Sequence, residues 1–163
     1  IDHSRRAGCS VFIVHARKAW LSGLSPKQNR ELPPLNYPTV FQLKKDFPEL
    51  TIVLNGGLSD IAACESALEQ LDGVMIGREA YQNPYMLGEV DSLFGLTDAP
   101  PRPQRVDIAT RYAKYIETQL NHGVRLNHMT RHILGLFNGQ PGARKWRRYL
   151  SEHAYKPDAG IDT

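Results

Sequence analysis

Two short apolar runs, each stopped by glycine at its carboxyl end, constrain the fold of this chain more than any other feature. The runs cover residues 51–54 and 74–76, and the residues that stop them are Asn55, Gly56 and Gly57, then Gly77 and Arg78. An amphipathic segment, residues 61–71, lies between them, so the pattern predicts two parallel strands joined by a helix. In parallel α/β folds ligands bind at the carboxyl ends of strands, and the last such loops of β/α barrels commonly hold a phosphate.

A third apolar run precedes these two. Residues 10–14 are continuously apolar, as is typical of a strand buried on both faces, and the run ends at His15. A helix is expected over residues 38–46. The first half of the chain therefore predicts three β/α steps, whose strands are parallel because of the length of their connections.

Three strands cannot close a barrel, and the chain begins at Ile1, inside a helical pattern and without methionine. We therefore expect a C-terminal portion of a larger protein, carrying the last three β/α units of an eight-stranded TIM barrel. A truncated sheet also leaves an open edge, which favours self-association of the chain.

The periodicity becomes purely helical after a proline-rich segment. Helices are predicted over residues 106–121, 125–137 and 143–153. The expected organisation is an α/β domain over residues 1–95, a linker over 96–103 and a small helical domain over 104–163.

The charge is unevenly distributed. Residues 1–103 hold ten lysines and arginines against twelve acidic residues, whereas residues 104–163 hold ten against five. The basic second part fits either a polyanionic partner or an ordinary solvated basic face. A further pair of cations, Lys27 and Arg30, lies in the long loop after the first strand, where phosphate contact and simple solubility are both open.

Candidate site residues gather at the strand ends. His15, followed by Arg17, fits a functional position better than a structural one, because the next two strands also end in glycine. Asn55 either contacts a ligand or belongs to an Asn-Gly turn. Arg78 starts a helix, where a cation is disfavoured unless an anion is present, so a bound phosphate explains it best.

Other chemistries have no support in the sequence. The chain has no Ser-His-Asp arrangement, CxxC pair, HExxH, Walker loop or GxGxxG motif, so we assign no catalytic residue and no metal ligand. Cys9 and Cys64 lie far apart in the sequence, and we expect both to be buried as small hydrophobic side chains. This use of cysteine favours a reducing, cytoplasmic setting. No secretory signal or membrane span is visible.

Several blocks of the sequence closely resemble the A class of bacterial tRNA-dihydrouridine synthases. The longest is HARKAWLSGLSPK, residues 15–27, followed by Asn29 and Arg30. The others are NGG at 55–57, DGVMIGR at 72–78, YQNP at 81–84, GLF at 135–137 and PGAR at 141–144.

The resemblance implies an FMN-binding β/α barrel that uses NADPH to reduce the C5–C6 bond of uridines in tRNA. The positions that match FMN contacts are His15, Asn55, Gly56, Gly57, Gly77 and Arg78. Lys27 and Arg30 match tRNA-contacting positions, to which we add Arg17. We also assign tRNA binding to Arg131, Arg144, Arg147 and Arg148, because of their charge and their position in the helical domain.

The family's proton-donating cysteine belongs to the earlier half of the barrel, and neither cysteine of this chain lies in that motif. The chain alone is therefore expected to be inactive and to need a missing N-terminal barrel half. Two alternatives remain: the phosphate-binding portion of another barrel enzyme, such as a flavin oxidoreductase, and a non-catalytic RNA-binding module.

Overall fold

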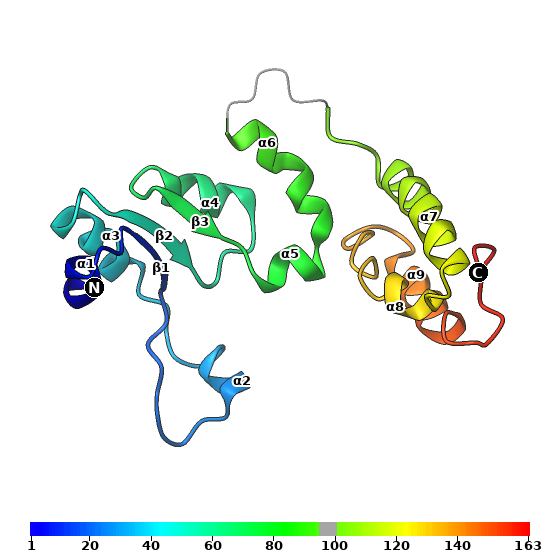
Figure 1. Ribbon diagram of the computed structural model, residues 1–163, viewed down its shortest axis with the longest axis horizontal. Coiled ribbons are helices and arrows are strands. Elements are labelled where there is room, and N and C mark those ends of the chain that lie inside the picture. The colour runs from blue at the N-terminus through cyan, green and yellow to red at the C-terminus, as the bar shows by residue number, and fades with distance from the viewer. Residues whose placement is uncertain (95–100) are drawn as a thin grey trace. The chain divides into compact units, whose positions relative to one another are not determined.

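The computed structural model describes residues 1–94 and 101–163 (Figure 1). Contacts divide the described chain into two compact units, Ile1–Gly77, which we call the sheet unit, and Arg78–Thr163, the helical unit. The expected linker, residues 96–103, lies outside the described residues except for 101–103.

The sheet unit contains the three parallel strands that the apolar runs predict. Strands β1 (Val11–His15), β2 (Thr51–Asn55) and β3 (Gly73–Met75) lie in the order β1-β2-β3, with all pairs parallel. Helices α1 (Asp2–Arg6), α2 (Pro26–Asn29), α3 (Tyr37–Asp46) and α4 (Ile61–Leu68) complete the unit. The strand-helix-strand prediction is confirmed.

Local sequence explains where the two covering helices begin. The Asn36 side chain accepts the Thr39 backbone N–H at the start of α3, and Asp60 accepts the N–H of Ala63 at the start of α4. These side chains satisfy N–H groups that the first helical turn leaves unpaired.

One face of the sheet forms the core and the other is open. Ile52 and Leu54 are completely buried on the face where α3 packs on β2 and α4 packs on β3. On the opposite face Val11, Ile13 and Met75 are 55%, 58% and 43% exposed. The prediction that β1 is buried on both faces is therefore wrong, because nothing in the described part of the unit covers its second face.

An ion pair connects α3 to the turn that leads into β3. Lys44 of α3 lies 2.8 Å from the Asp72 carboxylate, which also accepts the Ile52 backbone N–H at 2.8 Å. The Ile52 N–H, followed by Lys44, lowers the pKa of Asp72 below its ordinary value. Asp72 thereby fixes the turn into β3 against β2.

The helical unit consists of short and long helices. These are α5 (Arg78–Gln82), a 3₁₀ helix η1 (Pro84–Glu89), α6 (Val90–Leu93), α7 (Arg105–Asn121), α8 (Leu126–Thr130) and α9 (Ala143–His153). Ile116, Leu126, Met129 and Ala154 form a buried cluster between α7, α8 and the end of α9. The expected third helix, residues 143–153, is confirmed.

The helix expected over residues 125–137 is shorter than predicted. Helix α8 ends at Thr130. The chain then continues in turns closed by hydrogen bonds between residues i and i+3, such as that from the Ile133 N–H to the Thr130 carbonyl. Gly135 approaches the Gln82 carbonyl so closely that an added Cβ would lie 2.1 Å from its oxygen. This contact requires the chain to leave the helical path, although the apolar spacing alone favours its continuation.

Two tyrosine hydrogen bonds help to explain why residues 78–94 group with the C-terminal helices. The Tyr81 hydroxyl donates to the Arg131 carbonyl, and the Tyr85 hydroxyl donates to the Pro103 carbonyl. The contact division thus falls at Gly77, earlier than the expected boundary after residue 95. The bounds of independent domains stay a prediction.

Candidate functional site

His15 and Asn55 lie side by side at the carboxyl edge of the sheet. They are register partners at the ends of β1 and β2, and Met75 of β3 pairs with Asn55 from the other side. His15, Asn55 and Met75 stand on the open face, since their positions alternate with the buried Ile52 and Leu54. The predicted edge of the sheet therefore carries both polar candidates.

The His15 ring has a defined hydrogen-bonding state. Its Nδ1 accepts the backbone N–H of Arg17 at 3.1 Å. A neutral imidazole has one acceptor and one donor nitrogen, so the proton lies on Nε2. His15 thus offers an N–H donor at the exposed edge of the sheet.

Gly56 and Gly57 form a turn that requires glycine. Their φ angles are +111° and +75°, in a region that other residues rarely adopt. A Cβ on Gly56 would lie 3.0 Å from His15 Cε1, and one on Gly57 would lie 2.3 Å from Leu35 Cδ1. The turn is therefore packed against the imidazole and against the segment that leads into α3.

The backbone beside the strand ends presents two donors without acceptors. Within residues 1–94 and 101–163, no protein acceptor is found for the N–H groups of Gly57 and Gly77, whereas the parallel pairing of Asn55 with Met75 directs the Gly56 N–H toward the Met75 carbonyl. Gly57 and Gly77 each lie two residues beyond the paired positions Asn55 and Met75. Backbone N–H groups at a positive-φ turn are a typical anion-binding arrangement.

Tyr37 is a site residue that the sequence pattern did not reveal. Its hydroxyl donates to the Gly56 carbonyl at 2.8 Å, and burial raises the pKa of its phenol, which keeps it a donor. Tyr37 opens α3, far from the glycine turn in sequence. No motif or periodicity connects the two, and only the folding of the 16–36 loop over the strand ends brings them together.

Arg17 holds that loop from within. Its guanidinium donates to the carbonyls of Glu31 and Pro33, and its Nε is buried without a partner in the described chain. The Asn36 N–H also donates to the Ala16 carbonyl at 2.7 Å. Arg17 therefore acts inside the loop in this structure, and its assignment to tRNA stays a prediction.

Lys27 lies on a short helical turn of the long loop, and Arg30 follows directly after that turn. Helix α2 is bounded by a capping box between Ser25 and Gln28, and Arg30 is its C-terminal cap. The Asn29 side chain exchanges two hydrogen bonds of 2.8 Å with the Trp20 backbone. The two exposed cations are thus carried on a braced loop rather than on a free one.

Gly77 and Arg78 lie at the junction of the two units. Gly77 ends the sheet unit, and an added Cβ there would meet no atom within 4 Å. Arg78 begins α5 and has an interaction partner within the chain. Their joint role in holding a phosphate stays a prediction.

The arginines assigned to tRNA in the helical unit are exposed. Arg144, Arg147 and Arg148 lie on the solvent face of α9, whose opposite face buries Ala143 and Leu150. Arg148 pairs with Glu152 at 3.2 Å, and Arg131 donates to His132 Nε2 at 3.1 Å.

The two cysteines differ. Cys64 is completely buried, as predicted, and burial followed by the Asp60 charge raises the pKa of its thiol. Cys9 is exposed, so the prediction that it is buried is wrong. It precedes β1 at the amino end of the sheet, where its Sγ lies 3.4 Å from the Val11 carbonyl oxygen.

Residues 1–94 and 101–163 show neither a membrane-spanning helix nor a cluster of metal ligands. No helix there is long and apolar enough to cross a membrane. Residues 1–94 and 101–163 also contain no group of three or more histidine, cysteine or acidic side chains arranged to hold a metal ion.

Comparison with known proteins gives a consistent result. Residues 1–162 match the dihydrouridine synthase (Dus) family. The chain is 56% identical over 160 residues to a tRNA-dihydrouridine(20/20a) synthase of Vibrio cholerae, covering 98% of this chain and 48% of that protein. It is 55% identical over 160 residues to the protein of the same name from Escherichia coli K12, covering 98% of this chain and 46% of the relative.

The chain spans about half the length of the curated relatives it matches. A Shewanella oneidensis relative of the same name is 56% identical over 163 residues, which are 99% of this chain and 48% of that protein. Because the match extends over residues 1–162, this chain belongs to the dihydrouridine synthase family.

Proposed function

We propose that these residues are the C-terminal portion of an FMN-dependent tRNA-dihydrouridine synthase, which reduces uridine C5–C6 in tRNA with NADPH. The observation that carries the proposal is the family match over residues 1–162. The relatives' names specify tRNA uridines 20 and 20a, and we extend that substrate to this protein.

The sheet unit fits one arc of a TIM barrel. Its parallel strands have helices on one face, while Val11, Ile13 and Met75 form an exposed apolar surface on the other. In a closed barrel such inward side chains are buried by the remaining strands. The N-terminal barrel half of the relatives is the partner that supplies those strands; in its absence the open face favours self-association.

The residues at the carboxyl edge suit the phosphate end of a flavin. The N–H groups of Gly57 and Gly77 provide donors, and His15 adds an N–H at Nε2. Asn55 offers an amide beside them, and Arg78 follows Gly77 in the chain. When bound, FMN would supply the hydride, and these residues would hold and orient the flavin.

The proton donor of the reaction lies outside this chain in our account. Cys64 is buried with a raised thiol pKa, and Cys9 lies at the amino end of β1, opposite to the candidate site. Five strand residues separate the two ends of β1, roughly 16 Å at about 3.3 Å per residue. Neither thiol therefore fits a role at the carboxyl edge.

The basic surfaces fit the phosphates of tRNA. Lys27 and Arg30 stand on the braced loop of the sheet unit, and the arginines of α9 form a second basic face. A purely RNA-binding protein would use these surfaces without the glycine turns. Flavin binding distinguishes the two functions.

The test joins this chain to the N-terminal half of the Escherichia coli relative. We expect the joined protein to hold FMN, and Gly77→Ala to weaken FMN binding about tenfold, because a Cβ displaces the phosphate from its donors. Gly160→Ala is the matched control, since a Cβ there also meets no atom within 4 Å and neither glycine has a positive φ. A folded joined protein that binds tRNA but no FMN would support the RNA-binding alternative.

A further inference from the structure

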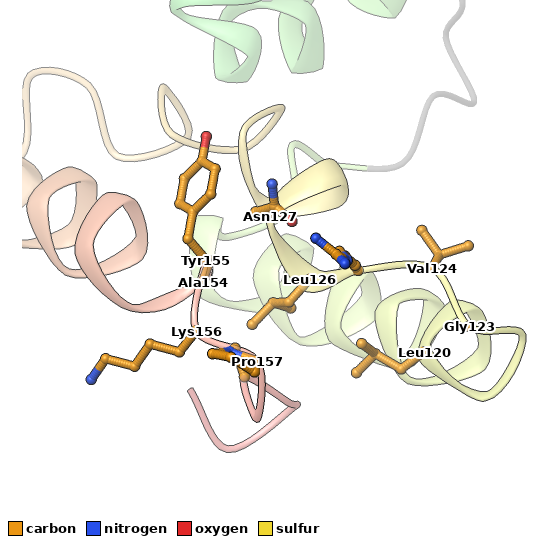
Figure 2. A pocket seen from close by; sticks show the side chains of 11 residues that line it. Leu120, Gly123, Val124, Leu126, Asn127, Ala154, Tyr155, Lys156 and Pro157 are labelled. Atoms are coloured by element: carbon orange, nitrogen blue, oxygen red, sulfur yellow. The ribbon is translucent and has the colours of Figure 1, made fainter.

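A pocket of about 330 Å³ lies in the helical unit, away in sequence from the glycine turns (Figure 2). It is bounded by the end of α7, the beginning of α8 and the segment that follows α9. All its lining residues fall between positions 120 and 159, so the pocket shares no residue with the candidate flavin site. Its volume is within the range of small-ligand sites.

The floor of the pocket is apolar. Leu120 of α7, Leu126 of α8 and Val124 of the connection between these helices line it, and Ala154 and Pro157 line it from the segment after α9. Leu126 and Ala154 belong to the buried cluster of the unit, so this floor is part of a packed core. A rigid apolar floor suits the flat face of an aromatic ring.

The polar groups of the lining are cationic or neutral. Arg125 and Lys156 contribute two positive charges, and no acidic side chain lines the pocket. Within residues 1–94 and 101–163, neither cation forms an ion pair. The lining is thus complementary to an anion and leaves both charges available to it.

Two further side chains supply what a nucleobase needs. Asn127 is half-buried and brings an amide that can donate and accept, and the Tyr155 phenol projects beside it in Figure 2. Proteins read unstacked RNA bases by stacking them on aromatic or apolar surfaces and bonding their edges. The apolar floor corresponds to the base, the Asn127 amide to the base edge and Arg125 to the phosphate, whereas the Lys156 side chain points away from the other labelled side chains in Figure 2.

We infer that this pocket binds a single unstacked nucleotide of the RNA substrate. The base lies on the apolar floor with its edge toward Asn127, and the phosphate is held by Arg125, with Lys156 adding a second positive charge to the lining. The inference rests on the proposed tRNA function, and it adds a nucleotide-binding site that is separate from the site of reduction. An acidic peptide would satisfy the cations but leave the floor and the amide unused.

The test maps backbone amide NMR shifts of the chain on titration with uridine 5′-monophosphate, uridine and inorganic phosphate. We expect the monophosphate to shift the amides of Gly123, Val124, Leu126 and Ala159, and uridine to shift the same amides more weakly. Arg125→Ala with Lys156→Ala should weaken the monophosphate about tenfold, the loss expected for charge-assisted bonds to phosphate. Arg111→Ala with Lys114→Ala, exposed on α7 outside the lining, is the charge-matched control.

Three results would overturn the inference: phosphate shifting these amides as strongly as the nucleotide, the control pair weakening binding equally, or shifts confined to other residues. Transfer RNA affinity, measured in parallel, separates this inference from the proposed function. Salt-sensitive tRNA binding that the Arg125 and Lys156 changes leave intact, with no nucleotide shifts at the pocket, would refute the pocket alone. An unaltered chain that does not bind tRNA would refute the tRNA function. The nucleotide titration would still show whether the pocket binds a nucleotide.

Discussion

At the scale of single residues, the candidate site depends on glycine for two different reasons. Gly56 and Gly57 are required by positive φ angles and by close contacts with His15 and Leu35. Gly77 is required by neither, since a Cβ there would meet nothing within 4 Å. A bound phosphate that approaches the backbone gives a reason for the third glycine that the protein's own packing does not.

Gly57→Ala should destabilise the fold. The new Cβ would lie 2.3 Å from Leu35 and would adopt a φ of +75°, so we expect a loss of about 1–3 kcal/mol in the free energy of unfolding. Urea denaturation measures it. Gly77→Ala is the comparison and should leave stability within about 0.5 kcal/mol; equal losses at both positions would show that the Gly57 contacts are not what the structure indicates.

At the scale of elements, the sheet unit is held by a carboxylate that bridges α3, β2 and the turn into β3. Asp72 has a folded-state pKa lowered first by the Ile52 N–H and then by Lys44. A group whose pKa is lowered on folding stabilises the protein above its unfolded pKa, about 3.9 for aspartate. That contribution is lost as the pH falls through the unfolded value toward the folded one.

Asp72→Asn should therefore lower stability near pH 7, and the difference from the unaltered protein should shrink as the pH falls below about 4. Thermal unfolding followed across this range measures the effect. Glu69→Gln, which removes an exposed carboxylate just before the same turn, is the control and should change little. A difference that stays constant with pH would contradict the assignment of the Asp72 charge to this bridge.

Helix α9 carries the second element-scale prediction. Arg144→Ala with Arg147→Ala removes two exposed cations, so the slope of log affinity for tRNA against log salt should become shallower by about 1.5. Arg5→Ala with Arg6→Ala removes the same charge from α1, where both arginines pair with Asp2, and should change the slope less. Equal changes for both pairs would indicate general attraction to a basic protein, without a specific role for α9.

The sequence predicted the elements better than it predicted their contacts. Strand and helix positions follow from local periodicity, as the agreement of residues 143–153 with α9 shows. The helix expected over 125–137 ends at Thr130 because Gly135 meets Gln82, a contact between distant residues that periodicity does not contain. Tyr37 and the inward role of Arg17 were hidden for the same reason, because both depend on how a long loop folds back.

At the scale of the whole molecule, the exposed face of the sheet and the length of the relatives point in the same direction. Val11, Ile13 and Met75 leave an apolar surface that a full barrel would bury, and the curated relatives are about twice as long as the chain. His15 and the glycine turns form one edge of a site whose remaining walls come from elsewhere. In the proposed function this chain binds and orients the flavin, and the proton donor lies in the half of the relatives that the chain does not match.

The most direct test of this account is dihydrouridine formation in tRNA that lacks the modification, measured by mass spectrometry with NADPH and FMN present. The chain alone should form none, and the chain joined to the N-terminal half of the Escherichia coli relative should form dihydrouridine at positions 20 and 20a. Dihydrouridine produced by the chain alone would contradict the account. So would a joined protein that holds FMN and binds tRNA but leaves both uridines unreduced.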